Sequence, residues 1–368
     1  MKKFSLKSMI CLGTLALLSL LCFLAWFFTG KTLESQKAAE RWGGDSELAF
    51  RQFTVFLPES GRIGQEDIYR FRGTLETRLA DASLETPERG SLYCDAWSAS
   101  GKLTVSGENG TGEASVIAVG GQYFHFHPLT LVSGSYLSEN DLMKDRVLLD
   151  EDLAWLLFGG TDLAGMTVTI NDLPYVVAGV VSREADKAST ETYTGGAGMY
   201  MSFEAFSAIA EQGADCYEIV LPEPVDGFGA GLMKENFSIG DGELVENTGR
   251  YSFTRGLKLL GDFGTRSMRT SPVVYPYWEN AARYYEDWCA LYLLLGLLLA
   301  VGPLGGVLVL LFRLCRKGKA LVAAKLPAAA ARAADEAQYR LFSRRSSRGS
   351  HEKKRRGGKH GKRYAQKH

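Results

Sequence analysis

The chain has 368 residues, with 42 Lys and Arg against 42 Asp and Glu, so its formal net charge is zero. Only six residues are cysteine, which excludes a small scaffold held together by disulfides, since a chain of this length buries a sufficient core without them. The neutral average hides a partition. Residues 31–287 hold 21 basic and 39 acidic residues, a net −18, whereas residues 316–368 hold 17 basic and three acidic residues, a net +14.

The first element is an apolar run over residues 9–28, twenty residues without a charge. Such a run is long enough to cross a bilayer core of about 30 Å as a helix. A cleaved signal peptide is the competing interpretation, but the run exceeds the usual apolar region and residues 25–30 offer no small-x-small cleavage site. We therefore predict a retained transmembrane helix after a short cytoplasmic N-terminus, residues 1–8.

A second apolar run covers residues 288–312 and predicts a second transmembrane helix. Lys2, Lys3 and Lys7 precede the first run, and Arg313 and further basic residues follow the second. Because basic residues favour the cytoplasmic side, both termini are expected in the cytoplasm. Residues 31–287 then form one large extracytoplasmic domain on the plasma membrane.

The first part of this outer domain predicts a strand over residues 51–57 and then an amphipathic helix over 65–81, with apolar residues at helical spacing. Three short strands follow near 92–98, 102–106 and 114–119.

In the centre, Asp150 suits the N-cap of a short helix that Gly159 closes. Residues 166–170 and 175–181 alternate around a turn at 171–174 and predict a hairpin.

The last part repeats the order strand, helix, strand. The predicted elements are a strand and helix over 199–210, a strand over 215–221, a helix near 227–234 and a strand near 243–253. The predicted fold is therefore α+β: a β-α-β subdomain with an inserted strand-rich subdomain at about 115–205, set between two transmembrane helices.

Few residues indicate chemistry. His125 and His127 would share one face of a strand, but no further ligand lies near them in sequence, so we predict no metal site. No Ser, Cys or Lys stands in a recognisable catalytic setting, and we expect neither a cofactor nor enzymatic activity. Cys94 and Cys216 lie well inside the outer domain, and whether they form a disulfide stays open.

The centre resembles the extracytoplasmic core domain of MacB-type (FtsX-like) ABC transporter permeases, over the segments LVSGSYLSEND (131–141), VLLDEDLAWLLFG (147–159), DLAGMTVTI (162–170) and YVVAGVV (175–181). The resemblance implies a structural role, in turns or in the core, for a set of motif residues. These are Ser133, Gly134, Asp141, Phe158, Gly159, Gly165, Gly179 and Val180.

The chain departs from this family after Phe312. A full permease of this type carries two further transmembrane helices, whereas residues 313–368 form a basic cytoplasmic tail, helical over 320–334 and expected to be disordered after about 343. The tail predicts contact with anionic lipid, with a protein as the alternative; no nucleic-acid module accompanies it. A contact with a separate ATPase is expected at Leu321, Leu326, Tyr339 and Leu341.

The resemblance implies a permease-type subunit of an ABC export or envelope-remodelling complex, whose outer domain binds a substrate or an envelope or adaptor protein. No ATPase motif is present, since Gly30-Lys31-Thr32 lies at a membrane exit, so a separate ABC ATPase would hydrolyse ATP. Companion permease subunits or a homo-oligomer are also expected. The alternative is a membrane-anchored interaction or sensor protein that does not transport.

Overall fold

The computed structural model describes residues 6–84, 90–266 and 272–357. Its elements in chain order are α1 (Leu6–Thr29), η1 (Glu34–Gln36), α2 (Ala38–Gly43), β1 (Phe50–Phe56), η2 (Glu59–Gly61), α3 (Gln65–Asp81), β2 (Cys94–Ser106), β3 (Thr111–Gly121), α4 (Tyr123–Phe126), β4 (Thr130–Gly134), β5 (Arg146–Asp150), α5 (Glu151–Phe158), β6 (Thr167–Ile170), β7 (Leu173–Ser182), α6 (Lys187–Thr192), β8 (Gly198–Ser202), α7 (Phe203–Ala210), β9 (Cys216–Pro222), α8 (Phe228–Asn236), β10 (Glu243–Glu246), α9 (Phe253–Arg266) and α10 (Tyr277–Gly357).

Four strands nearest the chain ends form one half of the outer domain. They lie in the order β10-β1-β9-β2, and each neighbouring pair is antiparallel. β1-α3-β2 and β9-α8-β10 are therefore two split β-α-β units whose strands interleave, the ferredoxin-like arrangement. We call this part the split half. It confirms the predicted repetition of strand, helix and strand on either side of a strand-rich centre.

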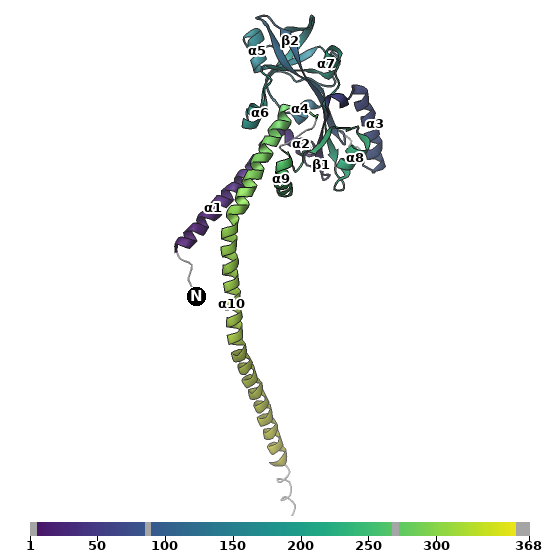
Figure 1. The fold of residues 1–368 in the computed structure, drawn as a ribbon. Coiled ribbons are helices and arrows are strands. Elements are labelled where there is room, and N and C mark those ends of the chain that lie inside the picture. Colours follow the sequence, from purple (N-terminus) through teal and green to yellow (C-terminus); the bar gives the residue numbers. More distant parts are fainter. Residues whose placement is uncertain (1–5, 85–89, 267–271, 358–368) are drawn as a thin grey trace, which may run out of the picture. The chain divides into compact units, whose positions relative to one another are not determined.

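The remaining strands form a second half around the end of β2. β2 pairs with β3, β3 with β8, β8 with β5, β5 with β7, β7 with β6, and β6 returns to β2 through Val105–Ile170. The pairings close a ring of six strands, and β4 pairs with β7 outside it. We call this part, with α5 and α6, the ring. Figure 1 shows α5 and α7 beside one end of β2 and α3 and α8 beside the other.

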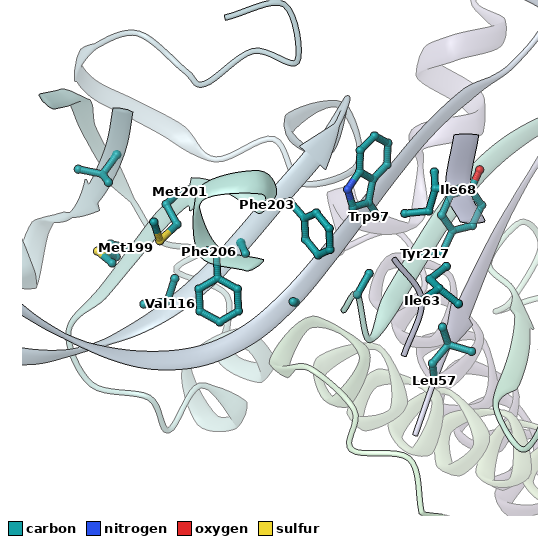
Figure 2. Packing of buried hydrophobic residues seen from close by; sticks show 14 of the residues in the cluster. Leu57, Ile63, Ile68, Trp97, Val116, Met199, Met201, Phe203, Phe206 and Tyr217 are labelled. Carbon is teal, nitrogen blue, oxygen red and sulfur yellow. The ribbon is translucent and has the colours of Figure 1, made fainter. Parts of the chain in front are cut away.

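One apolar core runs through both halves. Met199 and Met201 of β8 belong to the same buried cluster as Trp97 of β2 and Tyr217 of β9. Figure 2 shows these side chains in a row that passes by way of Phe206 and Phe203. The halves therefore share a core as well as the β2–β3 ladder, which pairs residues continuously from Ala96–Gly121 to Ser106–Thr111.

The opposite face of the split half carries a second core, covered by α2, α4 and the first turns of α10. Ala38 and Ala39 of α2, Phe126 of α4 and Trp278 of α10 are buried here. The start of the second membrane helix is thus part of the folded outer domain.

Several sequence predictions are confirmed in detail. α3 spans the predicted residues and buries Ile68, Phe71, Leu75 and Leu79. The Asp150 side chain accepts a hydrogen bond from the Leu153 N–H, and Gly159 ends α5 in the left-handed conformation. In the β6–β7 hairpin, Asn171 and Asp172 both have positive φ, as a tight hairpin turn requires.

Two predictions about strands are wrong. Residues 92–98 and 102–106 are not separate strands, because β2 continues through Gly101 in register with β3. A Cβ at Gly101 would lie 2.6 Å from the Phe206 ring, so this glycine makes room for a side chain and does not mark a turn. The strand near 243–253 ends at Glu246, and after a turn with Gly249 at φ 69° the helix α9 begins at Phe253.

The two predicted spans lie within longer helices. α1 and residues 277–320 of α10 are long and apolar enough to cross a membrane. The Ser19 hydroxyl of α1 donates to the Gly296 carbonyl of α10 at 2.9 Å, and Phe23 packs against the same glycine. Small residues at this place let the two helices approach closely.

The tail after residue 312 differs from its prediction. α10 continues as helix to Gly357, so the backbone is ordered as helix well beyond residue 343. Helix-favouring alanines over 320–334 and an i,i+4 ion pair between Glu336 and Arg340 support this continuation. Residues 358–368 lie outside the described residues.

Candidate functional site

The segment that enters α10 is joined to the split half by a buried network of charges. Arg250 lies in the turn after β10 and is 5% exposed, and Glu279 in the first turn of α10 is 1% exposed. The Arg250 guanidinium donates to both Glu279 carboxylate oxygens, at 2.7 and 2.8 Å, and its Nε donates to Glu286 at 2.6 Å. Such a two-oxygen contact fixes the orientation of both side chains.

Arg283 extends the network along α10. Its Nε donates to Glu279 at 2.6 Å, its Nη2 donates to Glu243 of β10 at 3.3 Å, and its guanidinium lies 4.1 Å from the ring of Tyr275. Two cations thus share Glu279. Burial by itself lowers the pKa of Arg250, but Glu279 and Glu286 outweigh it and raise this pKa well above its usual value. The arginine therefore stays charged at any physiological pH.

The same network reaches the segment that follows α1. The Gln36 side-chain oxygen accepts from Asn247 at 3.0 Å and from Arg250 at 3.5 Å. Gln52 of β1 is fully buried, donates to the Ser35 carbonyl at 2.8 Å and accepts from the Ala38 N–H at 3.1 Å. The polar contacts therefore hold the exits of both membrane helices to one sheet.

Direct contacts complete this junction. Tyr251 packs against Gly30 at the end of α1, where a Cβ would lie 2.8 Å from the tyrosine Cβ, and its hydroxyl donates to the Ala282 carbonyl at 3.2 Å. The Cys289 thiol of α10 donates to the Trp26 carbonyl of α1 at 3.7 Å. We call this whole arrangement the membrane-proximal junction. Its contacts join α1 and α10 to the split half.

The motif residues lie elsewhere, in and around the ring. Gly134, Gly159 and Gly165 have positive φ of 77°, 74° and 88°. A Cβ on Gly134 would lie 2.1 Å from the Ala178 carbonyl oxygen, and one on Gly179 would lie 2.2 Å from the Ser133 carbonyl oxygen. Only glycine permits this close approach of β4 and β7.

The other motif residues make local contacts or fill the core. The Ser133 hydroxyl donates to the Thr161 carbonyl, and the Asp141 carboxylate accepts from the Ser138 N–H at 3.0 Å. Val180 is fully buried, and Phe158 packs against the main core. Asp141 also lines a cleft between the two halves of the outer domain.

That cleft is bordered by α3, β3, the start of α7 and the loop of residues 137–146. Two of its lining residues, Glu139 and Trp97, contact Arg72. Arg72 pairs with Glu139 at 2.8 Å and with Asp95 at 2.7 Å, and its guanidinium lies 4.9 Å from the ring of Trp97. Burial by itself lowers the pKa of Arg72, but the two carboxylates raise it above its usual value. Beside the cleft, the side chain of Leu142 is almost completely exposed.

The two histidines are not on a strand. His125 lies in the short helix α4 and His127 directly follows it, where its Nε2 contacts a Glu218 carboxylate oxygen at 2.6 Å. His127 and Glu218 are both buried, and the His127 ring lies against the rings of Tyr123 and Trp278. Sequence reasoning missed Glu218, which is 91 residues away in β9. Within the described residues, no group of three His, Cys, Asp or Glu side chains could hold a metal ion.

Two further sets of candidate residues can be placed. Cys94 and Cys216 are both free thiols; Cys94 lies opposite Val220 and Cys216 opposite Ser98, so they stand several residues apart along paired strands. Of the four residues expected to meet an ATPase, Tyr339 is 78% exposed on α10. The side chains of Leu321, Leu326 and Leu341 lie outside the described part of the chain, although their backbone is helical.

Comparison with known proteins places the outer domain. The family model of the MacB-like periplasmic core domain matches residues 46–226. The macrolide export ATP-binding/permease protein MacB of Aggregatibacter actinomycetemcomitans is 37% identical over 87 residues, which are 23% of this chain and 13% of that protein. The same protein of Neisseria gonorrhoeae is 34% identical over 89 residues, 24% of this chain and 14% of that protein. The chain therefore matches about one seventh of the length of these relatives.

Solved structures are similar at low identity. The periplasmic region of MacB from Actinobacillus actinomycetemcomitans has a TM-score of 0.39 and 18% identity, over 65% of this chain and 99% of that one. The extracellular domain of the noncanonic ABC-type transporter YknZ from Gram-positive bacteria has a TM-score of 0.34 and 17% identity, over 49% of this chain and 87% of that one.

Proposed function

We propose, because residues 46–226 form a MacB-like periplasmic core domain, that this membrane protein is a permease-type subunit of an ABC export or envelope-remodelling complex. Its outer domain binds a substrate or an envelope partner, and a separate ABC ATPase supplies the energy. The observation that carries this proposal is the buried contact of Arg250 with Glu279 and Glu286. This contact fixes the start of α10 to the outer domain.

The charges of this network suit a coupling role better than a binding role. Arg250 and Glu279 are buried and satisfied by each other, so neither is available to a ligand. A buried ion pair with several hydrogen bonds specifies one arrangement of the groups that it joins. Movement of α10 is therefore passed to β10 and to the turn that carries Arg250, and from there to the rest of the sheet.

The cleft between the halves is the proposed place of binding. Glu139, Asp141, Lys144 and Arg146 supply charge of both signs at its border, while Trp97 and Phe124 supply aromatic surface. Exposed Leu142 and Met143 lie on the loop that borders it. Such a border fits an amphipathic molecule or a protein segment with both apolar and charged groups.

Both termini are proposed to be cytoplasmic, with residues 31–287 outside. The support is the placement of basic residues before α1 and after residue 312. Attachment of alkaline phosphatase after Gly90 and, separately, after Gly357 tests this orientation. Phosphatase activity is expected only from the fusion after Gly90, and activity from the fusion after Gly357 would reverse the orientation.

Co-purification tests the complex. The full chain, tagged at its N-terminus, is solubilised in detergent from its own cells, and an ABC ATPase is expected in stoichiometric amount. Replacing exposed Tyr339 by alanine should reduce recovery of the ATPase severalfold, whereas the matched control Tyr69→Ala on the outer domain should not. Recovery of the chain without any ATPase would replace this proposal by the membrane-anchored interaction or sensor protein.

The coupling is tested on the purified complex. Glu286→Gln removes one of the two negative charges that Arg250 contacts. Both oxygens of the other, Glu279, stay in place. We expect slower ATP hydrolysis by a complex that still contains the ATPase. Glu113→Gln, which removes a surface ion pair with Lys102 in the β2–β3 hairpin, is the control. Equal hydrolysis by the two variants would show that the junction does not couple the outer domain to the ATPase.

A further inference from the structure

α9 is an amphipathic helix that the function proposed above does not use. Its apolar residues recur at spacings of three and four, so they lie on one face of the helix. The opposite face is polar. The apolar face includes Phe253, Leu257, Leu260 and Phe263, with Leu259 at its edge, and the polar face includes Thr254, Lys258 and Asp262.

The contacts of α9 fix its depth relative to the two membrane helices. The ring of Phe253 meets that of Trp26 edge to face, with centroids 6.4 Å apart, and Trp26 lies two residues before the end of the first apolar run. Gly256 lies against Leu293, where a Cβ would be 2.8 Å from the leucine methyl group. Leu293 lies five residues inside the second apolar run, about 7.5 Å along the helix.

α9 therefore sits where both apolar runs leave the hydrocarbon. Gly256 favours this approach, since a Cβ there would lie 2.8 Å from a methyl group of Leu293 and the leucine side chain would have to shift. The helix is fastened by Arg255, which donates to the Glu246 carbonyl at 2.6 Å and also pairs with the Glu246 carboxylate. These contacts orient the helix and leave part of its apolar face uncovered by protein.

Three large apolar side chains of α9 remain exposed. The exposed fraction is 43% for Phe253, 43% for Leu257 and 47% for Phe263. At the depth given by Trp26 and Leu293, the medium around the protein is the boundary between lipid headgroups and acyl chains. An amphipathic helix at that boundary buries its apolar face in the acyl region and leaves its charged face among the headgroups. Lys258, on the polar face, is exposed, and a lysine side chain is long enough to bring its amine to the headgroup phosphates.

We propose that α9 is an interfacial helix bound to the lipid of the outer leaflet, with Leu257 and Phe263 in contact with acyl chains. The occupant of this apolar face is the same bilayer that α1 and α10 cross. The proposal rests on the two spans being inserted in a membrane and does not depend on transport. It adds a third membrane contact to the outer domain, directly beside the membrane-proximal junction.

Photo-crosslinking on the full chain tests the proposal. The photoreactive residue benzoylphenylalanine replaces Leu257 or Phe263 in one set, and Thr254 or Lys258 in the matched set on the polar face. The protein is reconstituted in vesicles of phosphatidylcholine and phosphatidylglycerol, irradiated, and analysed by mass spectrometry for the addition of one phospholipid. Phe28, exposed at the end of α1, is the lipid-facing control, and Trp155, exposed on α5, is the control remote from the spans.

Lipid adducts at positions 257 and 263 are expected at a yield comparable with that at position 28 and at least severalfold above those at 254, 258 and 155. Equal yields on the two faces of α9, or adducts to protein in place of lipid at 257 and 263, would overturn the proposal. Absence of lipid adducts at position 28 would overturn it as well, because its premise would be lost. Loss of ATPase co-purification, by contrast, leaves it unaffected.

A charge on the apolar face provides a second test. Leu257→Glu changes an exposed residue and leaves the contacts of Gly256 and Arg255 in place, so the fold is retained. With the photoreactive residue at 263, this substitution should reduce the lipid adduct severalfold, whereas Lys258→Glu on the polar face should leave the adduct unchanged. An unchanged adduct in Leu257→Glu would contradict the interfacial position.

Discussion

The split half and the ring bury polar side chains to very different extents. In the split half and the segments that flank it, buried polar or charged residues are numerous among the described residues: Ser35, Gln52, Thr54, Asp95, Ser98, His127, Glu218, Glu223, Asn247, Arg250 and Glu279. In the ring, the corresponding residues are Asp150 and Ser189. The ring is held mainly by apolar packing and by glycines that let strands approach. The half that carries the membrane helices is held by specific polar contacts as well.

This difference in buried polar residues indicates which segments of the molecule must be held in one position. An apolar core tolerates substitution as long as its volume is kept. A buried charge, by contrast, is stable only beside an opposite charge in good hydrogen-bond geometry. Arg250 and Gln52 connect segments that enter and leave the membrane, so those segments are held in one position relative to the sheet. The ring also contacts α10, because the Thr192 hydroxyl of α6 donates to the Tyr277 carbonyl and the Tyr285 hydroxyl donates to the Asp186 carboxylate at the start of α6. It carries the border of the cleft as well.

The largest effect is expected at Glu279. Glu279→Ala leaves Arg250 and Arg283 with fewer carboxylate partners in a buried place. Removing one member of a buried ion pair typically costs about 3–5 kcal/mol, because the remaining charge stays desolvated. Thermal unfolding of the full chain in detergent should show a loss of this size. Glu113→Gln at the exposed Lys102 pair should change stability by less than about 0.5 kcal/mol, and equal losses would remove the distinction between the halves.

The next effect concerns the ring. Gly179→Ala places a methyl group against the Ser133 carbonyl, and Gly134→Ala places one against the Ala178 carbonyl in a strained backbone conformation. Each change should destabilise the protein by about 2–3 kcal/mol, measured as the midpoint of unfolding. Gly110→Ala, in the β2–β3 turn with open space around it and no positive φ, is the control and should be nearly neutral. A tolerated alanine at 134 and 179 would show that β4 is not held against β7.

The smallest effect depends on pH and concerns Asp150, the one carboxylate of the ring that is buried among the described residues. Burial raises the pKa of Asp150 to about 6 from 3.8, although hydrogen bonds from Leu153 and Gly198 and the charge of Arg183 oppose the rise. The folded state therefore holds a proton that the unfolded chain has already lost. Stability from this group is complete below about pH 4 and is lost as the pH rises through about 6.

Asp150→Asn should remove that part of the pH dependence while it keeps the helix cap. Between pH 4 and pH 7, the unmodified chain should lose on the order of 2–3 kcal/mol more than the variant, from unfolding midpoints measured across the range. Parallel pH profiles for the two proteins would mean that Asp150 keeps an ordinary pKa.

Local signals explain which elements the sequence predicted. α3 follows from four apolar residues at helical spacing, and α5 from an Asp N-cap and a closing glycine. The split β-α-β order and the strand-rich centre follow from the succession of such elements. The motif around Gly134 and Gly179 predicted a tight turn region, and the structure adds the reason, the contact of two backbones.

Contacts between distant residues explain what sequence reasoning missed. Residues 92–98 and 102–106 were predicted as separate strands, because the local sequence does not reveal that β2 continues through Gly101 beside the ring of Phe206, 105 residues away. The membrane-proximal junction was not predicted at all, since Arg250 and Glu279 meet only after β10 and α10 are folded. α9 had a usable signal, the spacing of Phe253, Leu257, Leu260 and Phe263, but the preceding strand pattern was extended into it.

The position of β1 in the sheet has a consequence for how the chain is made. β1 is flanked by β9 and β10, and its first pair joins Phe50 to Pro222. Some 160 residues must therefore be synthesised after β1 before either edge is satisfied, while the contiguous strands of the ring pair first. During that interval β1 presents an apolar strand with two open edges, a template for association with other chains. Until β9 is synthesised, β1 lies close to the membrane that α1 has entered. Slow synthesis of the residues that follow the ring strands should therefore favour aggregation at the membrane surface.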